Sequence, residues 1–113
     1  MNENDSIQSY ITELRRGSLI LIVLGALRKP YYGYSLLQTL QEQGIDIEAN
    51  TLYPLLRRLE SQTLLVSEWD TAESRPRKYY SISERGKSVY EELIREWKKM
   101  QTGLETIIGG TAQ

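Results

Sequence analysis

The spacing of apolar side chains changes twice along this chain, and the two changes limit the folds it can adopt. In three segments before residue 62, apolar residues recur every three or four positions, which is typical of helices that bury one face. Between Leu64 and Ile82 the spacing falls to two, which is typical of strands. From Glu84 onward the spacing is helical again. The order helix, helix, helix, hairpin, helix predicts an α+β fold that is mainly α.

The first predicted helix covers residues 6–28. Lys29 and Pro30 end it, because the residue before a proline avoids the helical conformation. Gly17 loosens the segment, so the first sixteen residues either continue the helix or form a separate arm. The apolar positions that share one predicted buried face are Ile7, Ile11, Leu14, Leu21, Leu24 and Leu27.

Two shorter helices are expected at residues 34–43 and 49–61. Gly44 suits a left-handed cap after the first of them. Pro54 requires the second to begin close to Asn50, because proline is tolerated only in or near the first turn. The inward positions are Leu36, Leu37 and Leu40 in the first helix and Leu52, Leu55, Leu56 and Leu59 in the second.

A two-stranded hairpin follows. Its first strand begins at Leu64 and continues through Val66 to Glu68 or Trp69, and residues 70–74 form a polar turn. The return strand covers residues 77–82, where Tyr79 and Tyr80 are consecutive, so one faces inward and the other outward. Three helices and a hairpin in this order are the layout of a winged helix-turn-helix, with the hairpin as the wing.

The last helix is expected from Glu84 to about Ile108, with Ser83 as its N-cap and Gly109 and Gly110 at its end. We therefore expect residues 1–83 to form an N-terminal arm and a winged helix-turn-helix domain. Residues 84–108 would form a dimerisation helix, and residues 109–113 a flexible tail.

Composition excludes most catalytic sites. The chain has no cysteine and no histidine, so thiol nucleophiles, thiolate metal sites and the commonest general base are missing. Carboxylate and lysine chemistry remain, but no paired arrangement of these groups lies on one face. We expect no enzymatic activity, no metal and no cofactor.

The sequence also predicts a cytoplasmic protein with no membrane partner. Its first residues are acidic, whereas a signal peptide begins with positive charge. The longest apolar run, Leu19 to Leu27, is far shorter than the ~20 residues of a membrane span.

Positive charge gathers in the third helix and near the wing, although the net charge is only −1. The cations are Arg57, Arg58, Arg75, Arg77 and Lys78. A local cluster of this kind suits the phosphates of double-stranded DNA, since each neutralised phosphate releases a counterion. The alternatives are a solvated helix face for the first two and a soluble turn for the others.

Uncharged candidates for DNA contact lie at two helix starts. They are Tyr34 and Ser35 in the second helix and Asn50, Thr51, Tyr53 and Pro54 in the third. The start of a second helix offers free N–H groups to phosphate, and the start of a third can reach base edges. The alternatives are core packing for Tyr34 and Tyr53, and capping for Asn50 and Thr51.

The apolar positions of the last helix alternate steps of three and four over about two and a half heptads. They are Tyr90, Leu93, Trp97, Met100, Leu104 and Ile107. A seam of this length has too little of its own domain to pack against, so we expect a homodimer. A two-fold dimer would place two third helices about 34 Å apart, which suits an inverted-repeat operator.

Five segments carry a family resemblance. They are Arg16-Gly17-Ser18-Leu19, Tyr32-Gly33-Tyr34, Thr51-Leu52-Tyr53-Pro54 with Arg58-Leu59-Glu60, Arg75-Pro76-Arg77-Lys78-Tyr79-Tyr80, and Ser83 with Gly86. In this order and at these separations the sequence resembles the PadR family of bacterial transcriptional regulators. The resemblance implies a homodimeric winged-helix repressor, with the third helix in the major groove and the wing on the backbone.

Length and the single C-terminal helix resemble the smaller PadR subgroup, which includes multidrug-binding regulators. In that subgroup a tryptophan at the place of Trp97 stacks on flat ligands between subunits. The resemblance implies that Trp97 binds a planar aromatic effector, and packing of the interface is the alternative. The family often has glycine where this chain has Asn50, Thr63 and Ser74, and Thr63 leaves the end of the third helix open.

The predicted function is sequence-specific binding of DNA by a transcriptional regulator, a repressor that a small molecule releases. The alternative is a winged-helix module for protein–protein interaction without specific DNA binding.

Overall fold

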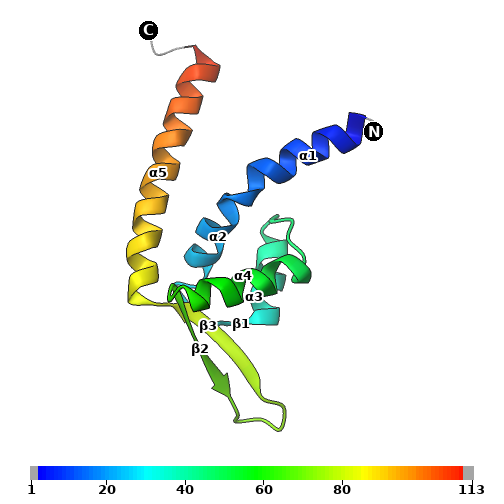
Figure 1. Cartoon of the computed structure of the whole chain (residues 1–113), viewed down its shortest axis with the longest axis vertical. Coiled ribbons are helices and arrows are strands. Elements are labelled where there is room, and N and C mark those ends of the chain that lie inside the picture. Colours follow the sequence, from blue (N-terminus) through cyan, green and yellow to red (C-terminus); the bar gives the residue numbers. More distant parts are fainter. Residues whose placement is uncertain (1–2, 111–113) are drawn as a thin grey trace.

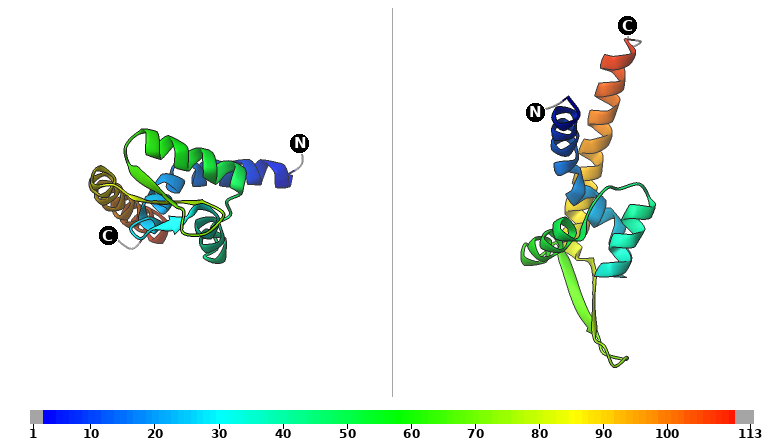
Figure 2. Two further views of the ribbon diagram at one scale, coloured as in Figure 1. Left: turned by 90° about the horizontal axis from the view of Figure 1, so that it is seen from below. Right: turned by 90° about the vertical axis from the view of Figure 1, so that its right-hand side faces the viewer.

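The computed structural model describes residues 3–110 and shows a small body from which two long helices and a wing project (Figure 1). Helices α1 and α5 leave the body on one side, and the wing leaves it on the other (Figure 2). The elements in chain order are α1 (Glu3–Arg16), α2 (Ser18–Ala26), β1 (Tyr31–Tyr32), α3 (Gly33–Glu42), α4 (Ala49–Ser61), β2 (Leu65–Asp70), β3 (Arg77–Ile82) and α5 (Glu84–Gly109). The wing comprises β2, β3 and the turn of residues 71–76 between them.

The segment predicted as one helix over residues 6–28 is two helices, α1 and α2, separated at Gly17. The separate-arm interpretation is therefore the correct one. The expectation that α1 buries its apolar face is wrong for a single chain, because Ile7 is 48% exposed and Leu14 is 78% exposed. Helix α1 points away from the body, so no other part of residues 3–110 covers this face (Figure 1).

The predicted bounds of α4 are confirmed, and α3 begins at Gly33, one residue earlier than expected. Pro54 is the sixth residue of α4 and so lies in its second turn, later than predicted. It has no N–H group to donate to the carbonyl of Asn50 one turn earlier, so that helical hydrogen bond is missing.

The sheet has three strands in the order β1-β3-β2, all antiparallel. The sequence predicts no strand between the helices at residues 6–28 and 34–43, and this is wrong: Tyr31 and Tyr32 lie opposite Tyr80 and Tyr79 of β3. Two residues show no periodicity, so only pairing with β3 identifies them as a strand. Strand β2 also extends to Asp70, which the sequence placed in the turn.

The core lies between α2, α3, α4 and the inner face of the sheet. Tyr80 is buried and Tyr79 only half-buried, which confirms that Tyr80 is the inward residue of this pair. The largest fully buried side chains are Val23, Leu24, Leu27, Leu36, Leu52, Leu56, Leu59 and Leu65.

The junction between α4, β2 and α5 is tightly built. Thr63 has a φ of 63°, in the left-handed region where glycine is favoured. Its carbonyl accepts a hydrogen bond of 2.6 Å from Ser83 Oγ. Ser83 Oγ in turn accepts one of 2.9 Å from the N–H of Gly86, which confirms Ser83 as the N-cap of α5.

The ends of α3 and α5 also lie at the glycines that the sequence predicts. Gly44 follows α3 with a φ of 82°, as predicted. Helix α5 runs through Gly109, and Gly110 caps it in the left-handed region. Residues 111–113 of the expected tail lie outside the described residues. Within residues 3–110, no helix combines the length and the apolar character needed to cross a membrane.

Candidate nucleic-acid interface

Helix α4 presents a polar and basic face to solvent. Its four leucines point into the core, whereas Asn50, Thr51, Pro54, Arg57 and Arg58 are exposed. Among residues 3–110, no carboxylate lies within ion-pair distance of either arginine. The two guanidinium groups are therefore available to an external anion.

A hollow of about 600 Å³ lies between the N-terminus of α3, helix α4 and the wing. We call it the wing groove. It brings together candidates from three separate parts of the sequence. The predicted site residues that line it are Tyr34, Ser35, Tyr53, Arg75, Arg77 and Lys78.

A second hollow, of about 440 Å³, lies between α4 and the α1–α2 junction. Four predicted residues line it, namely Asn50, Thr51, Pro54 and Arg58. Arg16 also lines it, and sequence reasoning did not include this residue among the candidates. The signal was present, because Arg16 opens one of the five segments of the family resemblance, but only the fold brings it beside α4.

The two tyrosines at the helix starts have different surroundings. Tyr34 is 65% exposed, so it is not a core residue, and its hydroxyl accepts a hydrogen bond of 3.3 Å from Gln38 Nε2. Tyr53 is half-buried and packs on Gly33, where a Cβ atom would lie 2.8 Å from Tyr53 Cε1. Tyr53 therefore both packs α4 on α3 and lines the wing groove.

The three cations of the wing also differ. Arg77 Nη2 lies 3.1 Å from Glu73 Oε1, and its guanidinium lies 4.4 Å from the centre of the Tyr32 ring. Lys78 Nζ lies 3.3 Å from Glu60 Oε1 on α4. Within the described part of the chain, Arg75 has no ion-pair partner.

The pKa values of Glu60 and Lys78 are both shifted by the contacts around this ion pair. A hydrogen bond from Ser67 and the charge of Lys78 lower the pKa of Glu60 despite its partial burial. For Lys78, desolvation acts to lower the pKa, but the bond to Glu60 and the neighbouring Tyr80 outweigh it, so the pKa is raised. Both groups are thus held in their charged forms at neutral pH.

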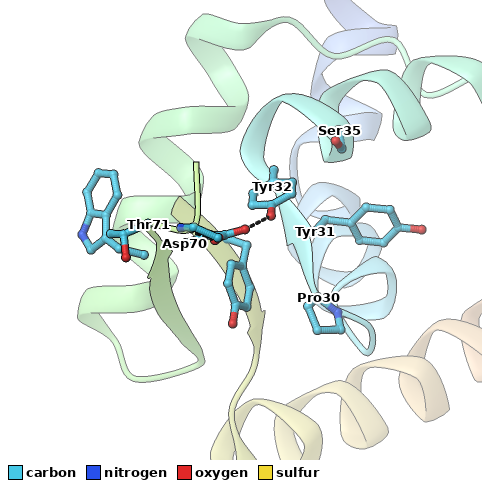
Figure 3. Close-up of a pocket in the computed structure, with 9 residues that line it drawn as sticks. Pro30, Tyr31, Tyr32, Ser35, Asp70 and Thr71 are labelled. Carbon is cyan, nitrogen blue, oxygen red and sulfur yellow. Dashed lines mark hydrogen bonds between the residues drawn. The ribbon is translucent and has the colours of Figure 1, made fainter. Parts of the chain in front are cut away.

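Tyr32 and Asp70 form a polar contact that sequence reasoning missed, because 38 positions separate them. The Tyr32 hydroxyl donates to Asp70, which also accepts a bond of 3.0 Å from the N–H of Ala72 (Figure 3). These bonds lower the pKa of Asp70, and the bond to the carboxylate raises the pKa of Tyr32. The pair borders a further hollow of about 900 Å³ that Pro30 and Tyr31 also line.

Within residues 3–110, the seam of α5 is covered only at its beginning. Tyr90 and Leu93 pack against the core. Farther along the helix, Trp97 is 43% exposed and Leu104 is 55% exposed. The other exposed apolar residues of the two projecting helices are Ile7, Tyr10, Leu14, Met100, Ile107 and Ile108.

Known proteins resemble this chain over the region that contains the candidate interface. Residues 20–92 match the model of the transcriptional regulator PadR-like family, a range that includes α3, α4 and the wing. A transcriptional regulator of Mycobacterium tuberculosis is 35% identical over 92 residues, which cover 74% of this chain and 86% of that protein. An uncharacterised protein of Lysinibacillus sphaericus is 30% identical over 104 residues, which cover 88% of this chain and 95% of that protein.

Solved structures confirm the predicted winged helix-turn-helix fold. A PadR family transcriptional regulator from Eggerthella lenta is 50% identical, with a TM-score of 0.85 over 93% of this chain and 94% of that one. A PadR-like regulator from Bacillus cereus is 25% identical, with a TM-score of 0.78 over 85% of this chain and 96% of that one. These relatives are transcriptional regulators, which agrees with the prediction of a non-enzymatic role. The chain belongs to the PadR-like family of transcriptional regulators.

Proposed function

We propose that this regulator binds a specific DNA sequence as a homodimer and represses transcription until a small molecule releases it. One observation carries the DNA-binding part of this proposal. Two hollows flank the exposed basic face of α4, and between them they contain ten of the eleven residues proposed to contact DNA, with Arg57 on the same face of α4.

Helix α4 is suited to the major groove. Its first residues, Asn50 and Thr51, are exposed and polar, as required of groups that reach base edges. Arg57 and Arg58 follow on the exposed side and can contact either guanine or phosphate. The wing groove would then receive the phosphate backbone. Arg75, which has no ion-pair partner among residues 3–110, would contact it together with Ser35 at the start of α3.

Homodimer formation is supported by the apolar faces of the two projecting helices. Monomeric soluble proteins rarely expose contiguous apolar patches of this extent. Helix α5 has 26 residues and is therefore about 39 Å long, so most of it lies beyond its own domain. A second copy that covers this face would create a two-fold axis, and the operator would be an inverted repeat with half-sites about 34 Å apart.

The effector part rests on Trp97. It lies in the middle of the seam and is 43% exposed in a single chain, so a planar aromatic compound can stack on it between two subunits. Titration of such compounds should quench Trp97 emission in a Trp69→Phe background and weaken operator binding. Absence of quenching across a broad panel would contradict this part and leave Trp97 as an interface residue.

The first experiment is fluorescence anisotropy with a labelled duplex from the region upstream of the gene, at ~150 mM salt with excess random DNA. Four to ten phosphate contacts per dimer predict a slope of log affinity against log salt of about −4 to −9. Retained binding would establish specificity. The protein is proposed to act in the cytoplasm, where this DNA lies.

Charge reversal tests the assigned surface. Arg58→Glu combined with Arg77→Glu should abolish operator binding and leave a folded dimer. The matched control is Arg95→Glu combined with Lys99→Glu, which reverses two exposed charges on the side of α5 away from the seam. If the double variant binds as the wild type does, the site assignment is wrong. If the wild type binds no DNA even at low salt, the protein–protein interaction module becomes the better account.

A further inference from the structure

Tyr32 lies where three elements of the structure meet. It is the last residue of β1 and directly precedes the first residue of α3. It also lies opposite Tyr79 in the ladder between β1 and β3. A side chain at this position can fix the orientation of the wing relative to the helices.

Three contacts attach the Tyr32 side chain to the wing. Its hydroxyl donates to the carboxylate of Asp70, which Figure 3 shows reaching across from the end of β2. The guanidinium of Arg77 lies over its ring, 4.4 Å from the ring centre. Its ring also meets that of Tyr79 edge-on, with the centres 5.8 Å apart.

These contacts lie at the outer end of the β2–β3 ladder, where they can fix the orientation of the wing. Asp70 and Arg77 are opposite one another and form the last pair of the β2–β3 ladder. Beyond that pair, residues 71–76 are all exposed and include Arg75. Tyr32 therefore holds both sides of the ladder at the point where regular pairing ends and the turn begins.

We propose that Tyr32 is a positioning residue for DNA binding. Through Asp70 and Arg77, it holds the cations of the wing in place relative to α3 and α4. This inference rests on the proposed function. A wing that is already oriented loses less conformational freedom when DNA binds, so affinity is higher.

Tyr32→Phe is the direct test, because it removes the hydroxyl and keeps the ring. We expect operator affinity to fall by about five- to tenfold, since a hydrogen bond to a charged group is lost. The slope of log affinity against log salt should stay unchanged, because the substitution removes no cation. The control is Tyr79→Phe, a neighbouring tyrosine whose hydroxyl lies 3.5 Å from Glu68 and which should change affinity less than ~2-fold.

A double variant tests whether the Tyr32 hydroxyl acts through Asp70. In an Asp70→Ala background, Tyr32→Phe should lower affinity by no more than ~2-fold, because the hydroxyl has no carboxylate left to bind. An undiminished loss in that background would contradict the proposal, as would wild-type affinity in Tyr32→Phe alone.

Hydrogen exchange in the free protein separates this inference from the proposed function. Tyr32→Phe should accelerate exchange of the amides of residues 71–75 and 77, and Tyr79→Phe should not. If the wild type binds no operator, the proposed function fails while this measurement still tests the attachment of the wing. Unchanged exchange in Tyr32→Phe would overturn the positioning role.

Discussion

Lys78 Nζ lies 3.3 Å from Glu60 Oε1, so a cation of the wing is ion-paired with the helix that presents the exposed arginines. Both side chains are about one-third exposed, at 30% and 32%. The pair joins the wing to α4, and it neutralises a charge that the sequence assigned to DNA contact. Lys78 therefore joins the wing to α4 at least as much as it supplies positive charge for DNA.

This pairing predicts unequal effects of two wing cations on salt dependence. Arg75→Gln should reduce the steepness of the log affinity against log salt plot by about 0.9, because it removes a cation that has no ion-pair partner in the described part of the chain. Lys78→Gln should reduce it by less than half as much, since Glu60 already neutralises Lys78. Operator titrations between 50 and 300 mM salt, roughly the range where this slope is measured, provide the comparison. Equal reductions would show that Lys78 leaves Glu60 when DNA binds.

The shifted pKa values predict that stability falls on both sides of neutral pH. The folded-state pKa values of Glu60 and Asp70 are lowered, so their contribution is present above the ordinary range near ~4 and is lost as pH falls through the folded values. Those of Lys78 and Tyr32 are raised, so their contribution is present below ~10 and is lost as pH rises through the folded values.

Urea unfolding across this range is the measurement. The midpoint should be nearly constant from about pH 5 to 9 and lower outside that window. Glu60→Gln should lower the midpoint at pH 7 and flatten the decline between about pH 5 and 3, because the titrating group is gone. A decline as steep as that of the wild type would show that Glu60 does not contribute to it.

Two glycines of α5 should respond to alanine in opposite directions. A Cβ atom on Gly86 would lie 2.1 Å from the carbonyl oxygen of Leu64, a backbone atom that cannot rotate away. Gly86→Ala should destabilise the fold by about 2–3 kcal/mol. No atom of residues 3–110 lies within 4 Å of the same position on Gly103, so Gly103→Ala should stabilise the fold by about 0.5–1 kcal/mol.

Thermal unfolding at one protein concentration checks both glycine variants, since a dimer unfolds in a concentration-dependent manner. About 1 kcal/mol corresponds to a shift of roughly 4–8 °C in Tm for a domain of this size. A stable Gly86→Ala variant would mean that α5 moves away from β2 at little cost.

Thr63 is expected to be strained by its left-handed conformation, with a φ of 63°. Thr63→Gly and Thr63→Ala both remove the hydroxyl that accepts a bond of 2.9 Å from Arg85. They differ in whether the left-handed conformation is strained, so the glycine variant should be more stable by about 1 kcal/mol. Urea unfolding of the two variants measures this difference, and equal midpoints would exclude the strain.

The seam of α5 makes a prediction about oligomeric state. Leu104→Lys places a charge in the proposed interface, and Thr102→Lys places the same charge on the opposite side of the helix. Light scattering after gel filtration should show a dimer for the wild type and Thr102→Lys, and a mass near the 13.1 kDa of one chain for Leu104→Lys. A monomeric wild type would contradict the dimer.

Local pattern was sufficient for the elements that bury a regular stripe. Helix α4 was predicted at its observed bounds, because its leucines recur at helical spacing. Strand β3 was likewise predicted, from the alternation that ends in Tyr80 and Ile82. Strand β1 was missed because a two-residue segment has no period, and only its partner on β3 defines it.

The candidate site shows a similar division. Residue type and order along the chain predicted the cations and the polar helix starts, because charge and capping preference are local properties. Pairing between distant residues was not predicted, and it changes what the cations can do. Lys78 is joined to Glu60, 18 positions away, and Tyr32 is joined to Asp70, 38 positions away.

The sequence by itself determined the order of the elements, the apolar face of each and the family to which the chain belongs, since these depend on neighbours a few positions apart. Tertiary structure alone decided that six candidates line one groove, that Arg16 lies beside α4 and that the apolar face of α1 is exposed. The physical reason is that ion pairs, hydrogen bonds and burial depend on distance in space, and only the packing of α2, α3, α4 and the sheet sets that distance for residues far apart in the chain.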